Sequence, residues 1–146
     1  MTLTSIYSQQ RGQLQRDAIL SATPVQLLTM LYDRLMLDLG RAEAAQLAGN
    51  WTVASENLIH AQAILSELTA SLKTEAWGGA DNLLGIYNYV SSALVTANVQ
   101  RDVELTREGI RLLEPLRQSW HEAAALLPAT QQPSRARSTG GNLGIA

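Results

Sequence analysis

The chain has 146 residues, of which 46% are hydrophobic, and this length suits one domain with a buried core. Its net charge of −2 gives no basic field that would attract nucleic acid or an anionic membrane, and its lack of cysteine excludes disulfides, thiolate metal sites and cysteine nucleophiles. The N-terminus has no apolar stretch typical of a secretory signal, and no run approaches the ~18 apolar residues that cross a bilayer. We therefore expect a cytoplasmic protein without membrane insertion.

The first predicted helix covers residues 23–48. Thr23 and Gln26 are spaced for a capping box, in which each side chain bonds the backbone N–H of the other residue. Pro24 takes the first helical position, where its missing N–H costs nothing, and Gly49 is a typical residue beyond a helix end. Apolar residues recur in between every three or four positions, which lines one helix face. They are Val25, Leu28, Tyr32, Leu35, Leu39 and Ala42.

The second and third predicted helices cover residues 51–73 and 81–98. The pair Gly78 and Gly79 interrupts the helical pattern between them, and Asp81 is the predicted N-cap of the third helix. Both helices repeat the spacing of three and four residues, so each has one face suited to a core. The predicted core positions are Ala54, Leu58, Ala61, Leu65, Leu68 and Leu72 in the second helix, and Leu83, Tyr87, Val90, Leu94 and Ala97 in the third.

The fourth predicted helix covers residues 102–127, with Asp102 as its N-cap. The link that precedes it is short, so the third and fourth helices should be antiparallel neighbours. Pro115 lies inside this helix and removes one backbone donor, which predicts either a bend near residues 111–114 or a break into two helices. The predicted core positions are Val103, Ile110, Leu113, Trp120, Ala124 and Leu127.

Four amphipathic helices joined by short links predict an all-α, antiparallel helical bundle over residues 23–127. A short N-terminal segment, 1–22, should precede it in helical or extended form. Residues 128–146 are rich in Pro, Gln, Ser, Arg and Gly, with too little apolar surface to offset the entropy of ordering them. We therefore expect a disordered C-terminal tail.

Residues that could carry out chemistry are sparse. Di-metal sites in helical bundles use Glu-x-x-His pairs, and neither His60 nor His121 has a glutamate three positions before it. Glu56 lies one turn before His60, which predicts a structural ion pair or a solvent-exposed contact. We expect no catalytic, metal or cofactor site, although a serine, histidine and carboxylate brought together by folding stay open as an alternative. An enzyme is the least favoured interpretation.

The helices carry more apolar residues than a minimal core requires. Such residues could widen an ordinary core stripe, or they could form a groove for another protein's amphipathic helix, and periodicity alone leaves both interpretations open. The apolar residues are Leu105, Leu112 and Leu116 in the fourth helix, Ile59, Ala63 and Ala70 in the second, and Ile86 and Tyr89 in the third. Ser66 lies in line with those of the second helix, and it is a small residue that, like Ala63 and Ala70, would let a partner backbone approach closely.

Four segments resemble the signature segments of the FliS family, the flagellin-specific export chaperones, and stand in the same order. They are ATPVQLLTMLYDRL (22–35), NLIHAQAILSELTASL (57–72), DNLLGIYNYV (81–90) and LVTANVQRD (94–102). Each is a modest signal, and together they are strong. The likeness covers roughly residues 5–121. Pro115 and the lack of an aromatic residue at positions 36–40 depart from the family pattern.

The resemblance implies a cytosolic chaperone that binds the disordered C-terminal segment of flagellin, prevents its premature polymerisation and presents it to the flagellar export apparatus. It implies that the N-terminal segment 1–22, through Ile6 and Tyr7, acts as a lid over part of the same surface, with a flexible terminus that carries a lone aromatic residue as the alternative. A self-associating structural module is the alternative, and a homodimer of the free chain is left open. The expected partner-binding residues are Ile6, Tyr7, Ile59, Ala63, Ile86, Tyr89, Asn98, Leu105, Leu112 and Leu116.

Overall fold

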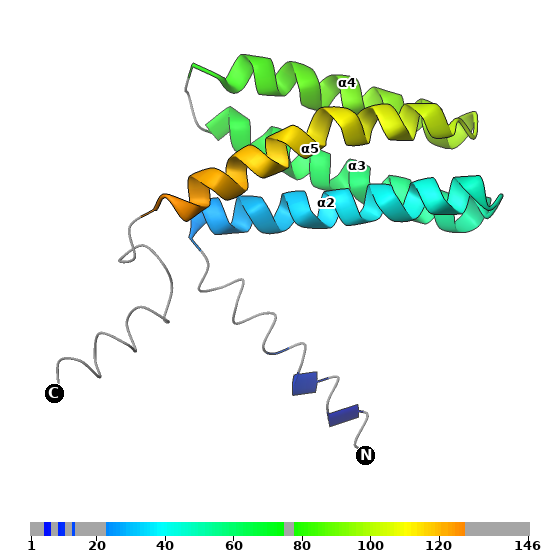
Figure 1. Ribbon diagram of the computed structural model, residues 1–146, viewed down its shortest axis with the longest axis horizontal. Helices are drawn as coiled ribbons and strands as arrows, with labels where there is room; N and C mark the ends of the chain where they lie inside the picture. Colours follow the sequence, from blue (N-terminus) through cyan, green and yellow to red (C-terminus); the bar gives the residue numbers. More distant parts are fainter. Residues whose placement is uncertain (1–4, 7–8, 11–12, 14–22, 75–77, 128–146) are drawn as a thin grey trace, which may run out of the picture. The chain divides into compact units, whose positions relative to one another are not determined.

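The computed structural model describes residues 5–6, 9–10, 13, 23–74 and 78–127 of the chain. Four long helices occupy this part: α2 (Pro24–Leu47), α3 (Trp51–Thr74), α4 (Ala80–Val99) and α5 (Val103–Ala125). No strand occurs among the described residues. The all-α antiparallel bundle predicted from periodicity is therefore confirmed (Figure 1). The predicted C-terminal tail, 128–146, and most of the N-terminal segment, 1–22, lie outside the described residues.

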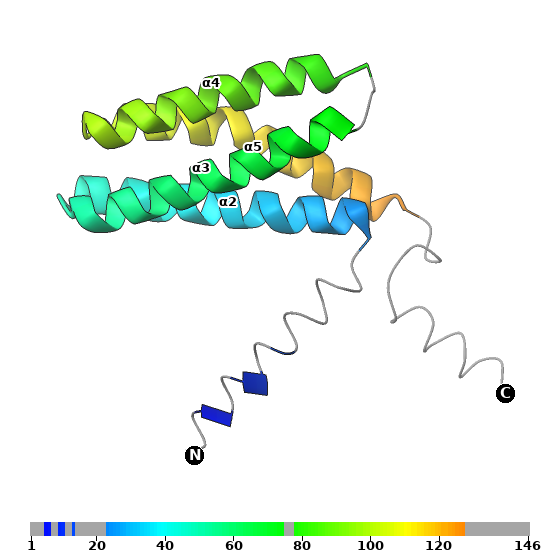
Figure 2. The same cartoon turned by 180° about the vertical axis from the view of Figure 1, so that it is seen from behind.

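Residues 28–121 form one compact unit that contains the core. Seen from opposite sides in Figures 1 and 2, α5 and α3 lie on opposite faces of the bundle, with α4 along one edge and α2 along the other. The core cluster draws from all four helices, and most of its members are those expected from the apolar spacing in α2, α3 and α4. They are Tyr32, Leu35, Leu39, Ala42, Leu58, Ala61, Ile64, Leu65, Leu68, Leu83, Tyr87, Val90, Leu94, Ala97 and Leu113.

The predicted cap of α2 is present in full. The backbone N–H of Thr23 donates to Gln26 Oε1 at 3.0 Å, and the N–H of Gln26 donates to Thr23 Oγ1 at 3.2 Å. This reciprocal pair satisfies two donors that the first helical turn leaves unpaired. The predicted cap of α5 is also confirmed, because the N–H of Glu104 donates to Asp102 Oδ1 at 3.0 Å.

The predicted N-cap of α4 is wrong. Gly79 is the capping residue, it makes no side-chain hydrogen bond, and Asp81 lies inside the first turn of the helix. The carboxylate of Asp81 still lies near the positive end of the helix, where a negative charge is favourable. The sequence rule selected the right turn but placed the cap two residues too late, because the helix begins at Ala80 directly after the two glycines.

The end of α2 follows the expected pattern for a helix closed by glycine. Gly49 has a φ of 73°, and its N–H donates to Gln46 O at 3.1 Å, while the N–H of Asn50 donates to Ala45 O at 2.8 Å. These two bonds form a Schellman motif, which turns the chain sharply into α3.

Pro115 does not break α5, which runs uninterrupted from Val103 to Ala125. Figures 1 and 2 show α5 changing direction near its middle, as expected where a proline removes a donor from the helix. The alternative of two separate helices is wrong.

The predicted core face of α5 is only partly correct. Leu113 is buried as expected, but the other buried positions are Thr106 and Gly109, whereas Ile110 and Trp120 are half-buried. The rule failed because it counts only apolar side chains. Gly109 is buried because it packs under Val90 of α4, and Thr106 is buried because its hydroxyl has a partner in the core.

Candidate functional site

The surface where α4 and α5 meet carries exposed apolar side chains. Tyr89 is 53% exposed and Leu112 is 38% exposed. The Tyr89 hydroxyl donates a hydrogen bond to the carboxylate of Glu108, which fixes the phenol across the two helices. The same bond raises the pKa of Tyr89, because ionisation would place a second negative charge beside Glu108. This surface therefore has an ordered aromatic residue that is not used in the core.

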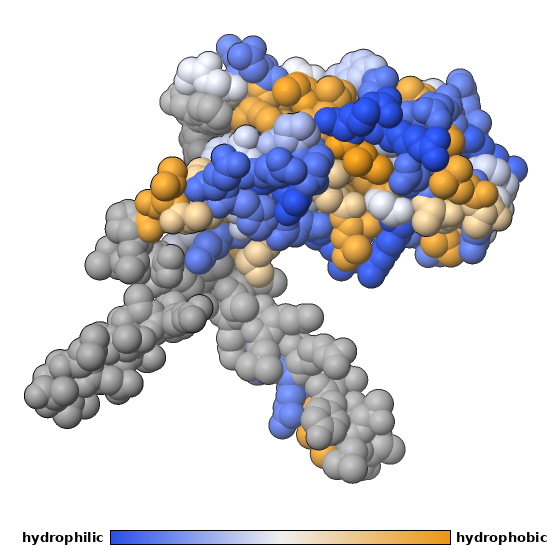
Figure 3. Space-filling model, viewed as in Figure 1, coloured by the Kyte–Doolittle hydropathy of each residue, from blue (hydrophilic) through white to orange (hydrophobic). Residues whose placement is uncertain are grey.

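Three other expected partner-binding residues, Ile86, Leu105 and Leu116, lie half-buried on the same pair of helices and pack against the core cluster. They contribute both to the core and to the floor beneath the more exposed side chains. In the view of Figure 3, hydrophobic surface gathers over α4 and beside α5, interrupted by hydrophilic side chains. We call Ile86, Tyr89, Leu105, Leu112 and Leu116 the α4–α5 surface.

The remaining expected residues lie elsewhere. Ile59 is 57% exposed and Ala63 is exposed on α3, the helix on the face opposite α5 (Figure 2). Asn98 is half-buried at the end of α4, and its Nδ2 donates to Ser55 Oγ at 3.2 Å. Ile6 is 38% exposed and belongs to a different compact unit from residues 28–121. Tyr7 lies outside the described residues. Within 28–121, the expected residues of α3, α4 and α5 therefore lie on more than one face of the bundle.

The charged pair expected of His60 is formed with a different partner. His60 Nδ1 contacts Asp38 Oδ2 of α2, and Glu56 takes no part in that pair. Asp38 is fully buried, and its second oxygen accepts a hydrogen bond from Arg34 Nε at 3.0 Å. A buried carboxylate is stable only when such partners bond it. We therefore assign Asp38 a structural role in the core.

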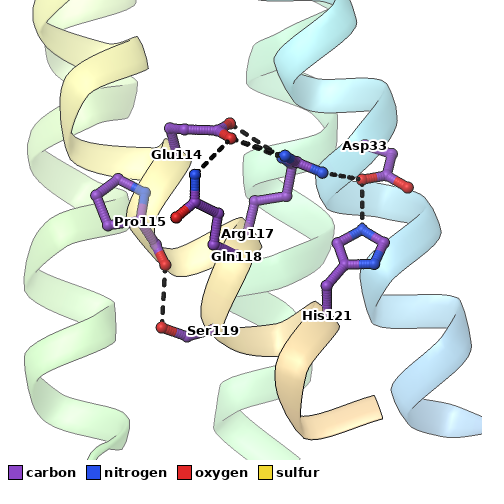
Figure 4. Close-up of polar contacts among 7 residues, drawn as sticks. All are labelled: Asp33, Glu114, Pro115, Arg117, Gln118, Ser119 and His121. Atoms are coloured by element: carbon purple, nitrogen blue, oxygen red, sulfur yellow. Dashed lines mark hydrogen bonds and ion pairs between the residues drawn. The ribbon is translucent and has the colours of Figure 1, made fainter. Parts of the chain in front are cut away.

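The second histidine belongs to an ion-pair network between α2 and α5 (Figure 4). Asp33 Oδ1 contacts both His121 Nε2 at 2.7 Å and Arg117 Nη1 at 3.1 Å. Arg117 also pairs with Glu114 at 2.7 Å and thereby holds the pKa of that carboxyl below its usual range. The network holds the part of α5 that follows Pro115 against α2.

Metal ions are bound by groups of acidic, histidine and cysteine side chains, and membranes are crossed by long apolar helices. No group of three or more His, Cys, Asp or Glu side chains suited to a metal ion occurs among residues 23–74 and 78–127. Within the same residues, no helix has the length and apolar character needed to cross a membrane.

A pocket that sequence analysis did not anticipate lies at the end of the bundle where the α2–α3 and α4–α5 turns meet. Its volume is about 260 Å³. The guanidinium of Arg101 lies over the ring of Trp51, 4.9 Å from its centroid, at the pocket wall. The lining residues are Gln46, Trp51, Ala54, Ser55, Ala97, Asn98, Val99 and Arg101. They come from two stretches far apart in the sequence, 46–55 and 97–101, so no local motif indicates them.

Comparison with known proteins gives one consistent result. The sequence model of the family described as flagellar protein FliS matches residues 7–126. The chain is 30% identical over 119 residues to the flagellar secretion chaperone FliS of Escherichia coli (strain K12), covering 80% of this chain and 88% of that protein. It is 33% identical over 108 residues to the Salmonella typhimurium protein of the same name, covering 73% and 80%. The Bacillus subtilis protein of that name is 29% identical over 109 residues, covering 75% and 81%.

Proposed function

The chain belongs to the FliS family of flagellar secretion chaperones, and from this premise we propose that it binds the C-terminal segment of flagellin in the cytoplasm before export. The segment is disordered when free and becomes helical when it binds. The family match over residues 7–126 is the observation that carries this proposal.

The physical role of the chaperone follows from the chemistry of its substrate. Amphipathic segments that assemble in the filament would associate prematurely if their apolar faces stayed free. A chaperone that buries these apolar faces prevents the premature association. Ordering the segment costs roughly 2–5 kcal/mol of the interaction energy, so affinity must come from contacts spread over a large area. An extended ligand held this way can be released stepwise to the export apparatus.

The α4–α5 surface supports the proposal as a place for one helical piece of the segment. An aromatic residue and a leucine are exposed there beside half-buried apolar residues, which is the composition of grooves that take an amphipathic helix. Ile59 and Ala63 on α3 would receive a second piece, since a wrapped ligand can contact opposite faces of the bundle.

Titration with a peptide of the flagellin C-terminus tests this function. We expect one-to-one binding by isothermal titration calorimetry, a negative heat-capacity change, and a melting temperature that rises with peptide concentration. A scrambled peptide of equal composition is the control. A chain that self-associates through the same surface would dimerise and give no heat with either peptide, and that result would replace the chaperone function by the alternative.

We include the N-terminal lid in the proposal, as a stretch around Ile6 and Tyr7 that competes with flagellin. Deleting residues 1–12 should leave helical circular dichroism and melting temperature unchanged and should raise the affinity for the peptide or leave it as it was. A large loss of affinity would instead make this stretch part of the binding surface.

A further inference from the structure

We propose that the pocket at the turn end of the bundle binds a carboxylate of the partner's bound segment, with Arg101 as its ligand. This inference rests on the proposed binding of flagellin and adds a polar anchor to the apolar surface. The pocket, at about 260 Å³, is smaller than pockets for drug-sized ligands, which hold roughly 300–1,000 Å³. It has room for a carboxylate and part of the residue that bears it.

The backbone of Arg101 is the first observation. Its φ is 55°, in the left-handed region, and it occupies the position after α4 that glycine usually takes. The N–H of Asp102 donates to Ala97 O at 3.0 Å, which completes the same type of turn that Gly49 forms after α2. A residue with a side chain is disfavoured here, so an arginine at this position calls for a use of its side chain.

The side chain of Arg101 is the second observation. It lies over Trp51, which fixes its position, yet Arg101 forms no ion pair within the described part of the chain. The neighbouring carboxylate of Asp102 is engaged by the N–H of Glu104. Arg101 is the only charged residue among the eight described residues that line the pocket. Its positive charge is therefore ordered and uncompensated.

The other polar groups of the pocket are also suited to donate. Asn98 Nδ2 uses one hydrogen on Ser55 Oγ and keeps a second, and the Ser55 hydroxyl, acting there as acceptor, keeps its own proton. Gln46 does not compete, because its amide bonds Ala97 O at 3.2 Å and the Thr106 hydroxyl at 2.7 Å. The site thus offers donors and one fixed guanidinium, which matches a singly charged carboxylate.

Two peptides distinguish the sources of the carboxylate. One is the flagellin C-terminal peptide with a free terminal carboxylate, and the other is the same peptide amidated at its end. Each is titrated into the wild type, Arg101→Gln and a matched control, Arg41→Gln, which also removes one positive charge from an exposed helix position outside the pocket.

If the terminal carboxylate binds, amidation of the peptide lowers its affinity for the wild type about tenfold. Arg101→Gln then lowers the affinity for the free-acid peptide about tenfold as well. The two changes together lower the affinity no more than either alone. If an acidic side chain binds, Arg101→Gln weakens both peptides equally. Both results support the pocket. Unchanged binding of both peptides to Arg101→Gln would overturn the inference while leaving the flagellin function intact, and no binding to the wild type would overturn both.

Arg101→Gly is a second variant, chosen because it should keep the fold while removing the side chain. Glycine adopts the left-handed φ freely, which offsets the loss of the contact with Trp51. We expect an unchanged melting temperature together with the same loss of affinity as Arg101→Gln. If Arg101→Gly binds the peptide as tightly as the wild type, Arg101 has only a local structural role.

Discussion

The hydroxyls of Tyr32 on α2 and Tyr87 on α4 form a hydrogen bond in the core, with ring centroids 6.4 Å apart. Both residues are almost fully buried, at 0% and 1% exposure. Each hydroxyl is the hydrogen-bond partner found for the other. Removing either hydroxyl should therefore leave the other one buried without its partner.

We predict that Tyr32→Phe lowers the free energy of unfolding by about 1–3 kcal/mol, because it leaves the buried Tyr87 hydroxyl unpaired. Tyr87→Phe should cost a similar amount, because it leaves the buried Tyr32 hydroxyl unpaired in turn. The double variant should lose less than the sum of the two single variants. Urea unfolding of all four proteins measures these differences, and strictly additive losses would contradict a coupled pair.

Alkaline pH should destabilise the fold through the same tyrosines. Burial raises the pKa of both Tyr32 and Tyr87 above the ordinary value of 10.0, and in Tyr32 the bond to Tyr87 adds to the rise. Above that value the unfolded chain releases these protons while the folded chain retains them. The contribution of these two tyrosines to the free energy of unfolding is thus fully present below about pH 10 and is lost as the pH rises further.

Urea midpoints measured at about pH 8 and about pH 11 test this dependence. The double phenylalanine variant is the control, and its midpoint should fall less over the same range. Tyr89 also has a raised pKa, from Glu108, but it is exposed, so solvent screens its contribution and it remains in both proteins. An identical decline in both proteins would assign the alkaline sensitivity to other groups.

Gly109 allows α5 to approach α4 closely. A Cβ added there would lie 3.3 Å from Val90 Cγ1 and 3.5 Å from Leu94 Cδ2, and both side chains are fully buried. Val90 is β-branched and cannot turn away easily. We predict that Gly109→Ala is destabilising by about 1 kcal/mol, because overpacking outweighs the gain in helix propensity.

Gly40 and Gly85 are matched controls for this substitution, since both are exposed within helices and a Cβ at either would meet no atom within 4 Å. Alanine at each should stabilise the protein by about 0.5–1 kcal/mol. Thermal unfolding of the three variants provides the comparison. A gain at Gly109 equal to those at Gly40 and Gly85 would show that the α4–α5 contact readily adjusts.

Apolar spacing predicted three of the four helix faces because the buried residues of α3 and α4 are Leu, Ile, Val, Ala and Tyr, and most of those of α2 are too. The polar exceptions in α2 are Thr29, Asp38 and Gln46. It was only partly correct for α5, where Gly109 packs against Val90 and a buried hydroxyl, Thr106, bonds Gln46. Neither residue type is counted by a hydrophobic pattern. Capping residues were predictable because their partners lie within three residues along the chain.

Contacts between side chains of different helices could not be predicted from the sequence. His60 could be paired only with Glu56 on its own helix, whereas its partner Asp38 is set by the rotation of α2 against α3. The pocket of Trp51 and Arg101 is likewise formed by two turns far apart in the sequence. The expected partner-binding residues of the helices, apart from Asn98, came from surplus apolar character, which does not indicate which helices pack side by side.

Leu112 and Leu37 provide a test of where flagellin binds. Both are leucines within helices, 38% and 47% exposed, and Leu112 belongs to the α4–α5 surface while Leu37 lies on α2. Replacing either by aspartate adds the same charge and the same loss of helix propensity. The two variants should therefore differ little in folding stability, to within about 1 kcal/mol by urea unfolding.

Binding should separate them. Burial of a leucine side chain contributes about 1.5–3 kcal/mol, so Leu112→Asp should weaken the affinity for the flagellin peptide at least about tenfold, and Leu37→Asp should leave it nearly unchanged. Calorimetric titration of both variants measures this. A parallel loss of stability and affinity in Leu112→Asp would assign Leu112 to the core. Equal weakening by Leu37→Asp would place the ligand over α2 as well, because a side chain that the partner does not cover has no reason to change the affinity.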